Sequence, residues 1–306
     1  MQKHKTWRSL LGVLWLVDGL LQLQPAMFGT QFIHQVLDAN LMGQPGWLTP
    51  ILRFSYSTWA AHPLLSDLGA AFLQIAIGIL LLLPSQIWYT RGLWLSLGWG
   101  SLVWFMGEGA GGMATANASF VTGSPGSAIL YVALTALLLL PITWWDSGRI
   151  GAVAGRIVGT LWLLGAILET RLDFFHAAGL VSPWQALATS PQPSVISSVI
   201  QQVALYLGHM SNWTNVSFIV IMAGFGVAYL LDWHPTWLKI SVGIWLFTIW
   251  WLAMDFGVLG GVGTDPNTPP IWLLLMALPW VCHPDRKAIL APVASRRRLE
   301  SQVGAQ

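Results

Sequence analysis

Charged side chains are scarce in this sequence. Asp, Glu, Lys and Arg make up 8% of the 306 residues, whereas hydrophobic residues make up 55%. A soluble domain typically carries about 25% charged residues, because its water-facing surface requires them. Several apolar runs approach the roughly 20 residues that cross a hydrocarbon core. The composition therefore predicts an integral membrane protein.

Cysteine is almost absent as well. Cys282 is the only one, which excludes an internal disulfide, a CxxC redox pair and a Cys-rich zinc or iron–sulfur site. The net charge of +2 comes without a basic stripe interleaved with aromatics, so nucleic acid is not an expected partner. No small-x-small cleavage site follows the first apolar run, which we interpret as an uncleaved membrane span.

An internal repeat is the most informative feature present. Gly12-Val-Leu-Trp recurs as Gly159-Thr-Leu-Trp, and Gly78 in one apolar run corresponds to Gly226 in another. The Gly-Gly pair at 111–112 corresponds to the pair at 260–261. Separations between these landmarks differ by only one residue between the copies, and such regularity indicates a duplicated unit. We expect two domains: residues 1–148, and residues 149–306 with a short basic cytoplasmic tail.

Eight apolar segments fit this plan, four in each copy. The predicted spans are 7–23, 64–83, 92–106, 128–142, 156–168, 216–231, 237–254 and 271–281. Because four spans per copy is an even number, the two copies run in the same direction through the bilayer. The predicted fold is an all-α, polytopic bundle of about eight transmembrane helices in two parallel four-helix repeats.

Basic residues predict the orientation of the bundle. All Lys and Arg except Arg53 and Arg171 fall on one side of the predicted spans. By the positive-inside rule this side is cytoplasmic, so both termini are expected in the cytoplasm. The expected location is the cytoplasmic membrane. Tryptophans cluster at span ends, as expected for an aromatic belt.

The long link after the first span of each copy lies on the predicted outer side. These two links hold four of the seven histidines: His34, His62, His176 and His209. Paired imidazoles could bind copper, zinc or haem, although their spacing matches no known ligand motif. Interfacial histidines are often plain surface residues, so both interpretations stay open.

The second outer link of each copy is rich in glycine. Gly111, Gly112, Gly260 and Gly261 leave peptide groups free to line a ligand site or to pack closely, and Asp265-Pro-Asn-Thr suits either a ligand contact or a helix N-cap. No catalytic residue can be assigned. Among acids near the bilayer, which include Asp18, we regard Glu108 and Asp255 as the strongest candidates for proton exchange or ligand contact.

One family resemblance emerges from the first span. Arg8-Ser-Leu-Leu-Gly-Val-Leu-Trp-Leu-Val-Asp-Gly-Leu-Leu-Gln-Leu23, with the four-span unit, resembles DoxX-like membrane proteins of bacteria. Segments 104–112 and 264–267 are similar to poorly characterised multi-pass proteins of the same group. DoxX units usually stand alone, whereas this chain carries two. The resemblance implies redox work at the membrane.

Three functional classes follow. The first is a membrane subunit of a quinone-linked redox system, with quinone, haem or copper as a cofactor. The second is a non-catalytic scaffold or assembly subunit that packs against other subunits of a membrane complex. The third is a transporter of a small solute or ion. The sequence leaves open whether the protein is an enzyme.

Overall fold

The computed structural model describes residues 2–190, 192–259 and 261–282, and within these ranges every regular element is helical. The candidate ligand residue Gly260 and the basic tail after residue 282 lie outside the described residues. The chain is therefore all-α over the part that the structure describes, as the sequence predicts.

Four longer helices form the first half of the bundle: α1 (Gln2–Leu21), α4 (Pro63–Leu82), α5 (Gln86–Leu102) and α6 (Ser127–Leu139). The link between α1 and α4 forms the short elements η1 (Pro25–Phe28), η2 (Ile33–Leu37), α2 (Asp38–Leu41) and α3 (Thr49–Ala61). After α5 come η3 (Val103–Gly107) and η4 (Ala110–Gly112). Proline sits in the first turn of α3 and α4, where its missing N–H leaves no intrahelical bond unmade.

The second half repeats this order. The helices that correspond to α1, α4, α5 and α6 are α8 (Arg149–Leu168), α11 (Ser211–Leu230), α12 (Thr236–Leu252) and α13 (Thr268–Val281). The link from α8 to α11 forms η5 (Leu172–Phe175), α9 (Ala177–Ala188) and α10 (Ser194–His209), and η6 (Asp255–Gly257) follows α12. The short helix α7 (Ile142–Asp146) joins the halves.

Each predicted span thus coincides with a helix, but the helices differ in length. By length and composition, α4, α8 and α11 are long and apolar enough to cross a membrane, whereas α6, α12 and α13 are shorter apolar helices. With 13 residues in α6 and 14 in α13, each is only about 20 Å long at roughly 1.5 Å per residue. The glycine-rich link precedes each of these short helices.

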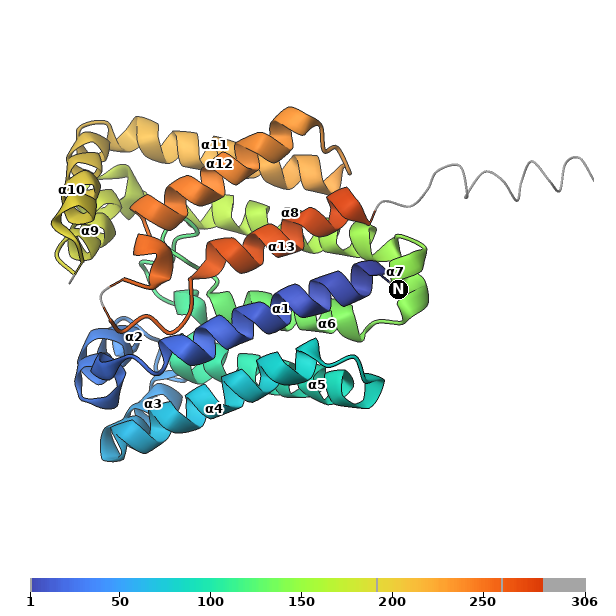
Figure 1. The fold of residues 1–306 in the computed structure, drawn as a ribbon. Helices are drawn as coiled ribbons and strands as arrows, with labels where there is room; N and C mark the ends of the chain where they lie inside the picture. The colour runs from blue at the N-terminus through green and yellow to red at the C-terminus, as the bar shows by residue number, and fades with distance from the viewer. Residues whose placement is uncertain (1, 191, 260, 283–306) are drawn as a thin grey trace, which may run out of the picture.

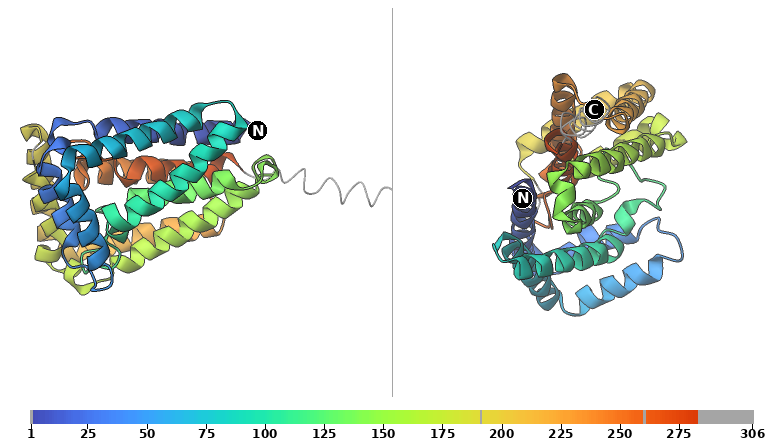
Figure 2. Two further views of the ribbon diagram at one scale, coloured as in Figure 1. Left: turned by 90° about the horizontal axis from the view of Figure 1, so that it is seen from below. Right: turned by 90° about the vertical axis from the view of Figure 1, so that its right-hand side faces the viewer.

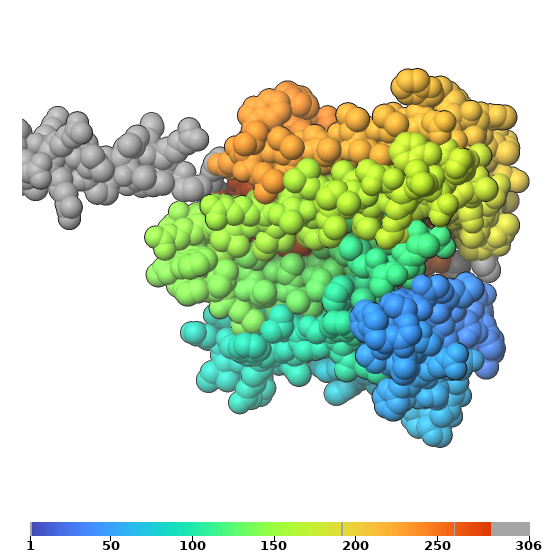
Figure 3. Space-filling view, turned by 180° about the vertical axis from the view of Figure 1, so that it is seen from behind, coloured from blue at the N-terminus to red at the C-terminus, as the bar shows by residue number. Residues whose placement is uncertain are grey.

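The longer helices lie side by side in one bundle, with α1 next to α13 at its centre (Figure 1). The N-terminus and α7 lie at one end of the bundle, and α2, α9 and α10 lie at the opposite end (Figures 1 and 2). Seen from behind, residues 30–60 in blue and the α9–α10 segment in yellow occupy the same end (Figure 3). Between the halves, the Trp7 indole donates to the Leu274 carbonyl at 3.1 Å.

The repeated glycines form equivalent helix crossings. A Cβ on Gly78 of α4 would lie 2.8 Å from the Gly12 carbonyl oxygen of α1, and a Cβ on Gly226 of α11 would lie 3.0 Å from the Gly159 oxygen of α8. Gly78 also faces Leu16, and Gly226 also faces Leu163. Small residues let helix backbones approach closely, so the landmark glycines of the repeat are the contact points of each helix pair.

Candidate functional site

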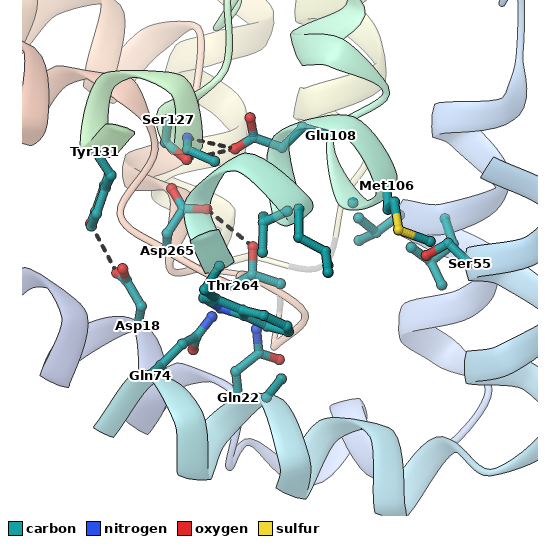
Figure 4. A pocket seen from close by; sticks show the side chains of 18 of the residues that line it. Asp18, Gln22, Ser55, Gln74, Met106, Glu108, Ser127, Tyr131, Thr264 and Asp265 are labelled. Atoms are coloured by element: carbon teal, nitrogen blue, oxygen red, sulfur yellow. Dashed lines mark hydrogen bonds between the residues drawn. The ribbon is translucent and has the colours of Figure 1, made fainter. Parts of the chain in front are cut away.

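A polar cavity of about 220 Å³ lies in the first half. Residues from α1, α3, α4, α5, η3 and the start of α6 line it, together with the loop before α13 of the second half. Figure 4 shows the labelled side chains of this lining gathered around one space. Its polar residues are Asp18, Gln22, Asn40, Ser55, Gln74, Glu108, Ser127, Tyr131, Thr264, Asp265 and Asn267.

Glu108 is held at the start of α6. Its Oε1 accepts hydrogen bonds from the Ser127 hydroxyl at 2.7 Å and from the Ala128 backbone N–H at 3.1 Å (Figure 4). A helix N-terminus favours an anion because its first N–H groups have no intrahelical acceptor. Burial nevertheless raises the pKa of Glu108 above the usual carboxyl range, and the neighbouring Asp265 raises it further. The other oxygen, Oε2, is buried and has no hydrogen-bond partner.

Asp18 lies on α1, one turn after Trp15. Its Oδ1 accepts a hydrogen bond from the Tyr131 hydroxyl at 3.2 Å, and the Trp15 and Tyr131 rings pack edge to face with centroids 4.8 Å apart. The Asp18 side chain is 2% exposed. Tyr131 therefore fixes this carboxyl between α1 and α6.

The third acid comes from the second half. Asp265 lies in the loop before α13, and its Oδ2 accepts a hydrogen bond from the Thr264 hydroxyl at 3.1 Å. Burial raises the pKa of Asp265. Hydrogen bonds from Ser127, Thr264 and Asn267 lower the pKa, but burial has the larger effect. Its Oδ1 is buried without a partner. A complete acidic cavity thus needs both halves.

Two amide oxygens in the cavity also lack partners. Gln22 follows α1 directly and Gln74 lies on α4; they are 4% and 5% exposed. Both side chains extend from the bundle toward the cavity (Figure 4), and Oε1 of each has no hydrogen-bond partner. A buried acceptor without a donor costs about 1–3 kcal/mol. Donors supplied by a ligand would remove this cost.

The charge of the cavity is one-sided. It holds the carboxyls of Asp18, Glu108 and Asp265, while its lining within the described ranges includes no Lys, Arg or His. Ionised carboxyls in a buried space without a counter-charge are strongly disfavoured. The site can therefore take up protons or bind a cation. The two processes compete, because both neutralise the same carboxyls.

Aromatic rings form much of the remaining wall. Trp15, Phe32, Trp59, Trp99 and Tyr131 all line the cavity. The Trp15 indole N–H donates to the Ser96 hydroxyl at 2.8 Å, and that of Trp59 donates to Asp67 Oδ1 at 2.9 Å. Trp99 Nε1 is buried without a partner.

The sequence-predicted acids separate in the structure. Asp265 and Glu108 line the cavity, but Asp255 does not. Asp255 lies in η6, where it and Phe256 have positive φ values of 50° and 56°, and its side chain is 5% exposed. Burial raises the pKa of Asp255 to about 6.

The predicted glycine residues pack against backbone. Gly111, with φ 62°, lies so close to Pro125 that a Cβ would overlap the Pro125 carbonyl, and its own carbonyl accepts a bond from Ser124 at 2.9 Å. Gly112 and Gly261 also have positive φ, at 66° and 78°. None of these three lines the cavity, whereas Gly107 does.

The four outer histidines are exposed. His34 contacts Asp38 on the same helical turn at 3.0 Å, His62 follows α3, His176 precedes α9, and His209 ends α10. Within the described ranges, no group of three or more His, Cys, Asp and Glu residues could hold a metal ion. The proposed binding of copper, zinc or haem by these histidines therefore stays a prediction.

Equivalent bonds in the two halves identify which residues correspond. The Trp104 indole donates to the Pro125 carbonyl at 2.8 Å, and the Trp250 indole donates to the Pro266 carbonyl at 2.7 Å. Four residues after each tryptophan stand Glu108 and Met254. Ser127 bonds Glu108, and correspondingly the Thr268 hydroxyl lies 3.5 Å from the Met254 sulfur.

The second half carries apolar residues or glycine at four positions that are polar in the cavity. The residues that correspond to Asp18, Gln74, Glu108 and Tyr131 are Gly165, Met222, Met254 and Trp272. The Phe120 ring occupies the space beside Gly165, where a Cβ would lie 2.6 Å from its Cγ. This ring packs against Trp162 and Trp272, each 5.7 Å away between centroids. Aromatic packing fills the place that is a polar cavity in the first half.

A buried carboxyl from the second half holds Phe120 in this position. Glu169 accepts a hydrogen bond from the Phe120 N–H at 3.0 Å and another from the Ser119 hydroxyl, and burial raises its pKa. Arg171 donates to the carbonyls of Thr115 and Ala116 at 2.6 and 2.7 Å. The first glycine-rich link is thereby fixed to the second half.

Several cavity residues escaped the sequence interpretation, above all Gln22, Gln74 and Tyr131. Asp18 and Gln22 are four residues apart in one apolar run, and Asp67 and Gln74 are seven apart in another. Polar side chains at helical spacing inside apolar runs share one face, so this pattern could have indicated the cavity lining.

No protein-family model, curated protein or solved structure matches this chain.

Proposed function

We propose that this chain is an integral membrane protein that binds a small cation in the cavity of its first half and carries it across the bilayer. The apolar outer surface supports the membrane assignment. Phe72 on α4, Ile167 on α8, Val220 on α11 and Ile244 on α12 are each at least 62% exposed. Apolar side chains on the outside of successive helices suit lipid as the solvent.

The proposed topology has eight crossings and both termini in the cytoplasm. The N-terminus and α7 share one end of the bundle (Figure 1), as this topology requires. Lys3, Lys5, Arg149 and the basic residues after 282 belong to that side under the positive-inside rule. The glycine-rich links and the cavity would then lie toward the outer side.

The observation that carries the proposed function is the set of three carboxyls without a basic partner. Removing an ionised carboxylate from water costs several kcal/mol, and a bound cation offsets that cost. When the cation leaves, protons can neutralise the same oxygens. Exchange of a cation for protons is the simplest reaction that this chemistry supports.

Solid-supported-membrane recordings on proteoliposomes test this function. Addition of sodium, potassium, magnesium, methylammonium or tetramethylammonium chloride should evoke a transient current for at least one cation. Glu108→Gln should reduce that current at least tenfold. Asp255→Asn is the matched control, because Asp255 is a buried acid outside the cavity. The current should persist in this variant. The absence of protein-dependent current for every cation would refute the proposed function.

The other two classes stay as predictions with their own tests. A redox subunit, as the DoxX resemblance implies, requires a bound quinone, haem or metal, which an absorption spectrum and metal analysis of purified protein would reveal. A scaffold requires a stoichiometric partner that co-purifies in mild detergent. Neither class accounts for the acidic cavity.

A further inference from the structure

We propose that the ligand of this cavity is a small protonated amine and not a bare metal ion. This inference rests on the cation-binding function proposed above and specifies the class of cation. It draws on four features of the cavity: the arrangement of its acids, its two buried glutamines, its indole surface and its size.

The three acids do not form a metal-binding group. Glu108 and Asp265 are close neighbours, because Ser127 bonds Glu108 and also contributes a hydrogen bond to Asp265, whereas Tyr131 holds Asp18 against α1. Among the described residues, no group of three or more such side chains could hold a metal ion. A bare metal ion needs several oxygen ligands at about 2.0–2.6 Å. A protonated amine needs no such shell, because each of its N–H groups can donate to a single carboxyl oxygen.

The amide groups match a ligand that only donates. Gln22 and Gln74 line the cavity and are each more than nine-tenths buried, and the Oε1 atom of each has no hydrogen-bond partner. Glu108 Oε2 and Asp265 Oδ1 are unpartnered acceptors as well. A protonated amine carries N–H donors and no acceptor, so it complements this set.

The indoles offer ring surface to the ligand. Because the N–H groups of Trp15 and Trp59 are already bonded to Ser96 and Asp67, these side chains can contribute only their rings to the cavity. Trp99 adds a third indole. Aromatic rings stabilise organic ammonium ions by cation–π attraction, and tryptophan is the most effective of them.

The size of the cavity agrees with a small molecule. At about 220 Å³ it is larger than the roughly 30 Å³ that one water molecule occupies in the liquid. It is smaller than the roughly 300–1,000 Å³ of drug-sized ligand pockets. An amine of a few non-hydrogen atoms fits between these limits.

Thermal unfolding of the purified full chain in detergent tests the inference. Methylammonium chloride should raise Tm by at least about 3 °C over sodium, potassium or magnesium chloride at equal ionic strength, because a ligand that binds only the folded state stabilises it. Glu108→Gln should abolish the shift. Trp99→Leu should weaken apparent affinity about tenfold, while Trp99→Phe should retain most of it. Trp94→Leu is the control on the same helix, since Trp94 is 60% exposed and lies outside the cavity.

The outcomes separate the two proposals. A shift that only metal cations produce, and that Glu108→Gln removes, would overturn the organic ammonium inference and leave the proposed function standing. No shift with any cation, together with no current, would overturn both. A methylammonium shift that survives in Glu108→Gln would show binding elsewhere and would also overturn the inference.

Discussion

Glu108 and Met254 occupy equivalent places in the two halves. Each stands four residues after a tryptophan whose indole donates to a proline carbonyl, and each contacts a hydroxyl in the first turn of the following helix. One position carries a carboxylate beside a cavity, and the other carries a thioether. The two halves thus share the local framework, and only the first half carries an acid at this position.

Phe120→Ala tests how the second half is filled. Removing this ring should leave a cavity beside Gly165 and lower the free energy of unfolding by about 3–5 kcal/mol. Phe72→Ala is the control, because Phe72 is 75% exposed. The free energy of unfolding of this variant should change little. Thermal unfolding in detergent measures both. Phe120 does not line the polar cavity, so one cation should still bind per chain. Equal stability of the two variants would contradict the assigned packing.

Gly78→Ala and Gly226→Ala test the two helix crossings. Each added methyl would press on a facing carbonyl oxygen and leucine, so we expect each to destabilise the fold by about 1–3 kcal/mol. Gly224→Ala provides a control on α11, since a Cβ there meets nothing within 4 Å and alanine favours a helix by up to about 1 kcal/mol. If all three variants unfold at one temperature, the glycines do not mark the crossings.

Cation binding should strengthen as pH rises. The pKa values of Glu108 and Asp265 lie above the usual carboxyl range because of burial, so protons compete with the cation at and below neutral pH. Asp18 and Tyr131 are the other ionisable groups in the cavity lining, and no basic side chain of the described residues faces them there.

The sign of the linkage can be checked without ligand. A raised pKa in the fold stabilises the fold at acid pH, and this contribution is lost as pH rises through the folded-state pKa. The unliganded protein should therefore lose stability with rising pH while the ligand-induced Tm shift grows. Unfolding scans from pH 5 to pH 8, with and without methylammonium, measure both trends. A shift that is independent of pH would exclude these acids from the site.

Ser127→Ala should alter this pH profile. Ser127 donates to Glu108 Oε1 at 2.7 Å, and a bond to the carboxylate lowers its pKa. Without that donor the pKa of Glu108 should rise further, so the pH midpoint of cation binding should move upward. Ser217→Ala serves as the control, because Ser217 is exposed and bonds only to Trp213 on its own helix. An unchanged midpoint would remove Ser127 from its positioning role.

Much of the fold was predictable because it depends on local patterns. Apolar runs marked the eight helices at the predicted spans, and the glycines that marked the repeat lie where α1 crosses α4 and where α8 crosses α11. Prolines predicted two helix ends: α4 ends at Leu82, shortly before Pro84, and α6 ends at Leu139, shortly before Pro141. The short elements in the outer links were less predictable, because packing more than periodicity determines them.

The site was predictable only in part. The sequence pointed to Glu108 as an acid near the bilayer and to Asp265 as a loop residue. That the two lie in one cavity depends on how the halves pack. Asp255 matched Glu108 approximately in sequence, yet the positive-φ turn at Asp255 and Phe256 leaves Met254 in the equivalent place. Gln74 carries no charge, so only its position on a helix face distinguished it.

The placement of Asp265 has a consequence for how the two copies can evolve. A fragment that stopped at α7 would lack the third carboxyl however well it folded, and the second copy alone has glycine and methionine where Asp18 and Glu108 stand. The copies are therefore complementary rather than redundant. Neither could be deleted, or exchanged for a duplicate of the other, without dismantling the cation pocket.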